Sequence, residues 1–297
     1  QNRARHLVTN ASVLYARMFL VLAISLYTSR VILRELGVVD YGIYGVVAGF
    51  IALVGFVSSA LTHTTQRFLA FEHGNTDGDV PGVFSTAIAI HVVAALVLYL
   101  VIALCGRIAV DRVLVFPKYR TEAVVATLYM STACFCLSIV QAPFVAAVLA
   151  QERMHLFAMV SVAESILKLG VALSLPFAKL DRLVHYALLV LLVAALVLAT
   201  YVFAELRTVL RILANPRFKQ DVAKKMASQA GWNLWGNIAA TIGTQGANVL
   251  LNVFFGPVAN AARSIAYQVN GAAGMFINNV QTAINPQLIK SYAAADR

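Results

Sequence analysis

Four charged side chains stand inside long apolar runs of this chain. Arg17 and Arg263 occupy the first and last of these runs, and Glu164 and Lys168 lie four residues apart in another. Four-residue spacing places two side chains on one helical face, so Glu164 and Lys168 are expected to pair. A charge in apolar surroundings is costly unless it pairs or faces a cavity. These arginines could therefore bind an anion, and Glu164 could take part in proton or sodium coupling.

Polar side chains also follow one face of an expected helix over residues 227–255. They fit within about 120° of arc at about 100° per residue. One reading is a hydrophilic cavity, in which guanidinium groups bind phosphate and amides bind sugar hydroxyls. The other is helix–helix contact for the amides and headgroup contact for the arginines. The candidate binding residues are Arg17, Arg30, Arg67, Asn233, Asn237, Gln245, Asn248, Asn252, Arg263 and Tyr267.

The composition places these residues in a membrane. The chain has 297 residues, of which 60% are hydrophobic and 12% are charged. Soluble domains average roughly 45–50% apolar and about 25% charged residues. These values exclude a disordered tail, a collagen-like fibre and a small disulfide scaffold, and they argue against an ordinary soluble enzyme. The chain is expected to be an all-α polytopic membrane protein.

Eight apolar runs are long enough to cross a bilayer, which takes about 20 residues per helix. Short connections carrying turn residues or charges separate them, and no soluble domain fits between them. The runs lie near residues 12–33, 41–61, 83–104, 123–149, 156–175, 183–204, 227–255 and 260–284.

The chain lacks the motifs of enzymes and of ATP-driven pumps. It has no Walker loop, no Gly-x-Gly-x-x-Gly, no His-Glu-x-x-His and no Gly-x-Ser-x-Gly. We therefore expect no catalytic residues, no metal site and no cofactor. The three cysteines fit small buried residues rather than a disulfide framework. The net charge of +10 lies mostly in loops, which favours membrane lipids rather than nucleic acid as the partner.

The basic residues of the loops indicate the orientation. With a cytoplasmic N-terminus, twelve Lys and Arg residues fall inside and eight outside, and the connection 205–225 supplies six of the twelve. We therefore predict a cytoplasmic N-terminus. The first apolar run contains Arg17 and has no small-residue cleavage site after it, so it is not expected to be a signal peptide.

A weak internal repeat appears at an offset of 219–220 residues. Leu36-Gly37-Val38-Val39 resembles Phe255-Gly256-Pro257-Val258, and Ser58-Ser59-Ala60-Leu61-Thr62 resembles Asn278-Asn279-Val280-Gln281-Thr282. Chance similarity between two apolar hairpins is the alternative. A repeat of six helices keeps the same topology in both copies. It predicts a first six-helix lobe at 1–220 and the first two helices of a second lobe at 221–297, so the chain would be truncated at its C-terminus.

Several stretches resemble a known family. They include Leu36-Gly37-Val38-Val39-Asp40-Tyr41-Gly42, Gly231-Trp232-Asn233-Leu234-Trp235-Gly236, Gln245-Gly246-Ala247-Asn248, Phe255-Gly256-Pro257-Val258-Ala259-Asn260 and Ile284-Asn285-Pro286-Gln287. The chain resembles polysaccharide or O-antigen (Wzx-like) flippases of the multidrug/oligosaccharidyl-lipid/polysaccharide exporter superfamily. These are transporters of 12 to 14 helices in two lobes around a central cavity.

The resemblance implies a transporter of the bacterial inner membrane that flips lipid-linked oligosaccharides by alternating access. Lipopolysaccharide or other polysaccharide biosynthesis would be its setting, with other polysaccharide assembly proteins as further partners. One alternative is a cation-coupled exporter of small molecules or drugs, which an acidic or aromatic cavity would favour. Another is a non-transporting membrane scaffold of a polysaccharide assembly complex.

Overall fold

The computed structural model describes residues 2–52, 54–75, 78–112, 117–179, 181–214 and 218–238, and single helical positions between 274 and 292. The described part of the chain is helical and contains no strand, which confirms the all-α fold class. Residues 220–238 form a helix. The other elements are α1 (Asn2–Ala52), α2 (Gly55–Gly74), α3 (Val80–Arg112), η1 (Lys118–Arg120), α4 (Thr121–Ala150), α5 (Met154–Ser174), η2 (Leu175–Phe177), α6 (Arg182–Ala204) and α7 (Leu206–Ala214).

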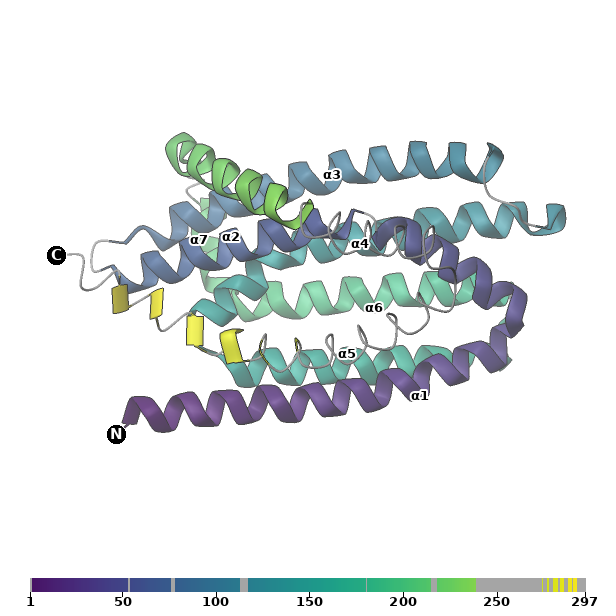
Figure 1. Ribbon diagram of the computed structural model, residues 1–297, viewed down its shortest axis with the longest axis horizontal. Helices are drawn as coiled ribbons and strands as arrows, with labels where there is room; N and C mark the ends of the chain where they lie inside the picture. The colour runs from purple at the N-terminus through teal and green to yellow at the C-terminus, as the bar shows by residue number, and fades with distance from the viewer. Residues whose placement is uncertain are drawn as a thin grey trace, which may run out of the picture.

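Five segments among the described residues are long and apolar enough to cross a membrane. They confirm the spans predicted near 12–33, 83–104, 123–149, 156–175 and 183–204. Successive passes alternate in direction, with α5 beside the first half of α1 and α4 beside α2, α3 and α6 (Figure 1). The protein is therefore a multi-pass membrane protein. The five segments are Ser12–Gly37, α3, α4, Met154–Phe177 and α6.

The first two predicted spans share one continuous element, because α1 bends sharply at Gly37 and returns along the bundle (Figure 1). Gly37 has φ 76° and ψ 171°, a region that is essentially restricted to glycine. The second predicted span, 41–61, does not coincide with one helix, and the helical part of this pass extends beyond residue 61. The returning pass is interrupted at Val54 and continues as α2 to Gly74.

The polar residues of α2 explain this difference. Thr62 donates to the carbonyl of Ser58 at 2.8 Å, and Thr64 donates to the carbonyl of Ala60 at 2.8 Å. A threonine that bonds to the preceding turn satisfies its own hydroxyl within the helix. The polar sequence after residue 61 therefore stays helical, with Thr64 and Thr65 fully buried.

Helix α4 is the centre of the bundle and packs against α1, α2, α3, α5 and α6. Its second half carries Ala142, Ala146, Ala147 and Ala150, all of them buried. Small residues allow helix backbones to approach closely inside a membrane, where no hydrophobic effect drives helices together. This run of alanines accounts for the central place of α4.

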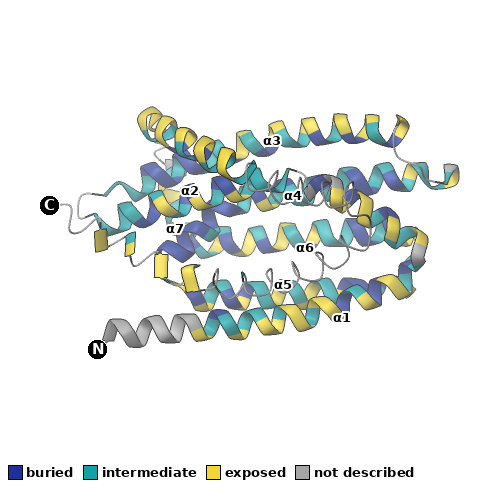
Figure 2. Ribbon diagram, in the orientation of Figure 1, coloured by how far each residue is buried: buried dark blue, intermediate teal, exposed yellow. Residues whose placement is uncertain are grey.

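The outer face of α3 shows the opposite pattern and is largely exposed (Figure 2). Leu96 and Leu100 are 62% and 67% exposed, and Val93 is 61% exposed. In a spanning helix such residues face lipid chains. The seventh predicted span, 227–255, is described only to residue 238. The eighth, 260–284, and the second-lobe boundary at 221 stay predictions.

Candidate functional site

Arg17 points from the first half of α1 toward α5. Its guanidinium carbon lies 4.4 Å from the centre of the Phe157 ring, which is a cation–π contact. Its Nε atom is buried and has no hydrogen-bond partner. Within the described residues, Arg17 forms no ion pair with a carboxylate. The contact with Phe157 therefore holds a guanidinium whose Nε donor is unsatisfied.

A cavity of about 300 Å³ contains Arg17. Arg17 lies at the end where α1 begins, and Glu164 and Lys168 of α5 form another part of the wall. Hydroxyl groups make up most of the remaining polar lining. The lining residues are Arg17, Val21, Ser25, Thr28, Ser29, Ile32, Ser161, Glu164, Ser165, Lys168 and Tyr186.

The predicted pairing of Glu164 and Lys168 is confirmed. Lys168 Nζ lies 2.6 Å from Glu164 Oε1, and about a third of each side chain is exposed. The pair also lines a second cavity of about 500 Å³ between the returning half of α1, α4, α5 and α6. Glu164 and Lys168 therefore stand where the two cavities meet. The wall of the second cavity includes Tyr44, Ser131, Cys134, Ser138 and Gln141.

Sequence reasoning missed the stripe that completes this site on α5. Ser161, Glu164, Ser165 and Lys168 follow the spacing i, i+3, i+4 and i+7, which marks one helical face. Counting that face would have found both serines. Phe157 gave no such signal, because one aromatic residue in an apolar run is unremarkable before its contact with Arg17 is known.

The remaining predicted binding residues lie elsewhere. Arg30 and Arg67 are exposed and line neither of these two cavities. Asn233 donates to Thr64 Oγ1 of α2 at 3.1 Å, which is the helix–helix contact given above as the alternative. Asn237 is half-buried on the same helix. The others lie outside the described residues: Gln245, Asn248, Asn252, Arg263 and Tyr267.

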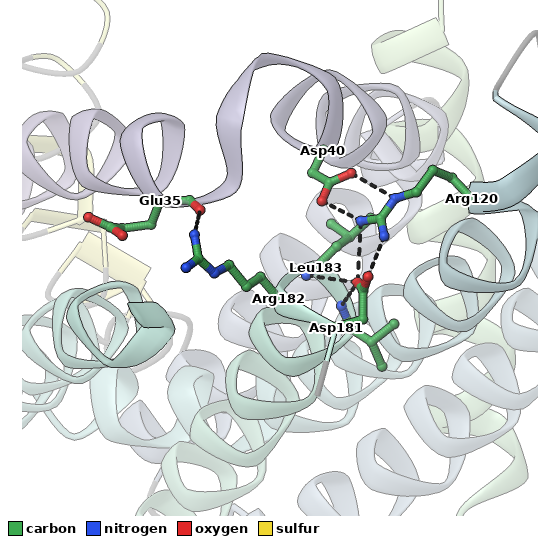
Figure 3. Close-up of polar contacts among 7 residues, drawn as sticks. Glu35, Asp40, Arg120, Asp181, Arg182 and Leu183 are labelled. Atoms are coloured by element: carbon green, nitrogen blue, oxygen red, sulfur yellow. Dashed lines mark hydrogen bonds and ion pairs between the residues drawn. The ribbon is translucent and has the colours of Figure 1, made fainter. Parts of the chain in front are cut away.

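A polar cluster that the sequence did not reveal closes the end of the bundle at which α1 bends (Figure 3). Arg120 of η1 forms ion pairs with Asp40 of α1 and with Asp181, the residue before α6. Arg182 donates to the carbonyl of Glu35 at 2.9 Å. We call Asp40, Arg120 and Asp181 the clasp, because it joins three connections that are distant in sequence.

The clasp shifts the pKa values of Arg120 and Asp181. Partial burial alone would lower the pKa of Arg120, but the carboxylates of Asp40 and Asp181 outweigh burial and raise it. Partial burial alone would raise the pKa of Asp181. Hydrogen bonds from Arg120 and from the backbone amides of Val184 and Leu183 outweigh that effect and lower it. The charged forms of both residues are therefore stabilised.

A buried carboxylate occupies the opposite end of the bundle. The Glu205 side chain is 4% exposed. It accepts hydrogen bonds from Gln151 Nε2 at 3.1 and 3.2 Å and from Arg153 Nη1 at 3.3 Å. These contacts join the connection between α4 and α5 to the end of α6. Within the described residues, no group of three or more His, Cys, Asp or Glu side chains could hold a metal ion.

No protein-family model and no curated protein matches the chain. Solved structures of membrane transporters do match it. A multidrug resistance MATE transporter of the MOP superfamily in an outward-facing conformation superimposes with a TM-score of 0.77 at 11% identity, over 97% of this chain and 65% of that one. The chain has the MATE fold.

Two further structures agree with this assignment. A MATE transporter in complex with MaD3S gives a TM-score of 0.78 at 12% identity, over 97% of this chain and 66% of that one. A MOP transporter from Pyrococcus furiosus, whose reversed pocket polarity suggests a different function, gives 0.73 at 11% identity, over 96% and 65%. The chain thus spans about two thirds of the length of these MATE-fold transporters. Identities this low establish the shared fold alone.

Proposed function

We propose that this protein is a membrane transporter that moves a lipid-linked oligosaccharide across the bacterial inner membrane by alternating access. Arg17 carries the proposal, because its guanidinium lines a hydroxyl-rich cavity and pairs with no carboxylate among the described residues. The MATE fold of known transporters supports the transport part. The oligosaccharide and its diphosphate linkage are the finer part of the proposal.

The chemistry of Arg17 suits a phosphate group. A guanidinium offers two parallel N–H donors that match two phosphate oxygens, and such charge-assisted bonds are roughly twice as strong as neutral ones. The cation–π contact with Phe157 holds the guanidinium against α5 before the ligand arrives. Ser161 and Ser165 donate to the carbonyls of Phe157 and Ser161 at 2.8 and 2.9 Å, so their hydroxyl oxygens offer acceptors to the hydroxyls of a sugar. A diphosphate headgroup would supply the missing counter-charge.

The depth of Arg17 fits loading from the cytoplasmic leaflet. Arg17 is five residues into the segment that begins at Ser12, which is about 8 Å along a helix axis. With the predicted cytoplasmic N-terminus, the guanidinium lies just below the inner headgroup layer. A lipid-linked sugar could place its phosphates there while its hydrocarbon tail stays in the bilayer.

A second candidate function is cation-coupled export of small molecules, and Glu164 favours it. Glu164 lines both cavities, and a carboxylate inside a membrane can exchange its charge. Its ion pair with Lys168 also has a purely structural explanation, because pairing lowers the free-energy cost of burying both charges. The two functions differ in the residue they depend on, which is Arg17 for the first and Glu164 for the second.

Transport by purified protein in proteoliposomes tests the proposal. The substrate is a fluorescent undecaprenyl-diphosphate oligosaccharide, and the measurement is the initial rate of its transfer between leaflets. Loss of a charge-assisted hydrogen bond costs about 1.5–3 kcal/mol, so Arg17→Ala should lower the rate at least about tenfold. Arg17→Lys should be intermediate, because a lysine cannot form the two-bond contact.

The matched control is Arg34→Ala, which removes an exposed arginine from the same helix and should leave the rate within about twofold. An unchanged rate for Arg17→Ala, with normal insertion, would remove the basis of the proposal. Gradient-driven uptake of a cationic dye that survives Arg17→Ala but is lost in Glu164→Gln would instead establish the second candidate.

A further inference from the structure

Helix α7 (Leu206–Ala214) follows α6, the last of the five spanning segments found among the described residues, without a linker. The backbone leaves the helical conformation only at Glu205, with φ −107° and ψ 18°. In Figure 1, α7 runs crosswise to the spanning helices, and it contacts α6 and α3. Helix α6 ends one residue earlier and is long and apolar enough to cross a membrane. With α6 spanning the bilayer, α7 would begin near the membrane boundary and its axis would follow the membrane surface.

The inner side of α7 is fixed to the bundle. Val209 and Ile212 pack against the main hydrophobic core. The backbone amides of Thr208 and Val209 donate to the carbonyl of Glu205 at 2.9 and 3.0 Å. The Glu205 carboxylate is in turn held by Gln151 and Arg153. The orientation of α7 is therefore set by the fold, and the same residues always face outward.

The outer side of α7 combines charge with apolar surface. Arg207 and Arg211 are exposed and four residues apart, so they stand on one face. In the described part of the chain, neither forms an ion pair with a carboxylate. Leu206 and Leu210 form a second ridge beside them and are 38% and 55% exposed. Phe203, near the end of α6, is 75% exposed.

We propose that the outer face of α7 binds the headgroups of anionic phospholipids. Arg207 and Arg211 would contact the phosphates, while Leu206 and Leu210 would insert at the boundary between headgroups and acyl chains. A helix with adjacent cationic and apolar ridges lies in the membrane interface in this way. Charge complementarity favours an anionic lipid as the ligand, because each Lys or Arg near an anionic membrane surface contributes about 1 kcal/mol to membrane binding. This site is independent of the transport cavity.

Native mass spectrometry of the purified full chain tests the proposal. The protein in detergent is titrated with phosphatidylglycerol or with phosphatidylcholine, and the dissociation constant of the first bound lipid is measured. The protein should prefer phosphatidylglycerol. The double substitution Arg207→Gln with Arg211→Gln should weaken phosphatidylglycerol binding about thirtyfold and leave phosphatidylcholine binding unchanged. Replacing both arginines by lysine should keep the affinity within about threefold, since the charge is retained.

The matched control removes two exposed basic residues from the opposite end, by Arg112→Gln with Lys179→Gln. This control should keep the preference for phosphatidylglycerol. Equal affinity of the unaltered protein for both lipids would overturn the proposal, as would an unchanged preference in the Arg207/Arg211 variant. Loss of the preference in the control would mean that the overall net charge, and not the α7 site, sets the lipid preference, and would also overturn the proposal. Binding of hexaglutamate that depends on α7, without lipid preference, would make this face a protein-docking surface.

A folding check separates loss of binding from loss of structure. Both double variants should elute as the unaltered protein does in size-exclusion chromatography, because all four side chains are exposed. If the glutamine variant of α7 unfolds, the lysine variant still decides the matter. Its preference for phosphatidylglycerol should fall as salt rises, since exposed charges are screened over about 10 Å at 0.1 M salt. A preference that salt does not change would overturn the proposal.

Discussion

Asp181 has two roles, and they can be separated by substitution. Its Oδ1 atom accepts hydrogen bonds from the backbone amides of Leu183 at 3.1 Å and Val184 at 3.3 Å, which caps the first turn of α6. Its carboxylate also pairs with Arg120 of the clasp. Asparagine caps helices about as well as aspartate but carries no charge. Asp181→Asn therefore removes the ion pair and keeps the cap.

We expect Asp181→Asn to lower the free energy of unfolding by less than about 1 kcal/mol at pH 7, because solvent screens a side chain that is 35% exposed. Asp181→Ala removes the cap as well and should cost about 1 kcal/mol more. Thermal unfolding of the purified protein in detergent measures both differences. Equal midpoints for the two variants would mean that the cap contributes nothing.

The difference in stability between the unaltered protein and Asp181→Asn should depend on pH. The pKa of Asp181 is lowered in the folded protein, so its ion pair stabilises the fold above the ordinary aspartate pKa of about 3.9. That stability is lost as pH falls through the lowered pKa. The difference between the unaltered protein and Asp181→Asn should therefore be constant from pH 7 to 5 and vanish in stronger acid.

Residue-scale prediction from the sequence succeeded for contacts within one helix and failed for contacts between distant segments. The pairing of Glu164 with Lys168 follows from helical spacing alone. The clasp joins Arg120 to residues 80 and 61 positions away, and no periodic pattern reports such a contact. Phe157 was missed for the same reason, since it meets Arg17 only after α1 and α5 pack together.

At the scale of elements, the bend at Gly37 allows the single helix α1 to form two passes that run in opposite directions. A non-glycine residue at φ 76° and ψ 171° would be strained. Asp40 of the clasp lies three residues after the bend, and Arg182 binds the carbonyl of Glu35 two residues before it. The bend is thus fixed on both sides by contacts to other helices.

Gly37→Ala should therefore lower the free energy of unfolding by about 1–3 kcal/mol, the usual cost of a residue held in a sparsely populated conformation. Gly42 provides the control, because it is helical and a Cβ atom there would meet open space. Gly42→Ala should be neutral or should stabilise by up to about 1 kcal/mol. Thermal unfolding in detergent measures both. A Gly37→Ala protein as stable as the Gly42→Ala protein would contradict this account.

Element prediction from hydropathy was good where apolar residues are continuous. Helices α3 to α6 were found with ends in error by a few residues, and α3 extends eight residues further than predicted. That extension contains Arg107 and Asp111, which pair at 3.0 Å across one helical turn. The prediction of the second pass differed from the structure for a related reason. Polar residues of α2 form hydrogen bonds within the helix, so they lower the hydropathy of α2 without ending the helix.

At the scale of the whole molecule, the polar clusters lie at opposite ends of the bundle. The clasp occupies the end at which α1 bends and α3 ends. The other end holds Glu205 with Arg153, and Lys219 paired with Asp79 at 2.6 Å. The second end also carries α7 and the exposed Lys224 and Lys225. Positively charged connections remain in the cytoplasm, so we expect the α7 end to face the cytoplasm and the clasp to face outward.

This orientation predicts which residues a membrane-impermeant maleimide reaches in intact bacteria. Cys105, Cys134 and Cys136 are first replaced by serine, and single cysteines are then introduced. Tyr119 is 82% exposed beside Arg120, so Tyr119→Cys should react in intact cells. Lys224→Cys should react only after the membrane is permeabilised. Val93→Cys, on the lipid-facing side of α3, should react in neither case, because maleimides need a hydrated thiolate. The reverse labelling pattern for Tyr119→Cys and Lys224→Cys would show that the protein has the opposite orientation in the membrane. Arg17 would then lie near the outer leaflet, where it could not receive a substrate from the cytoplasmic side.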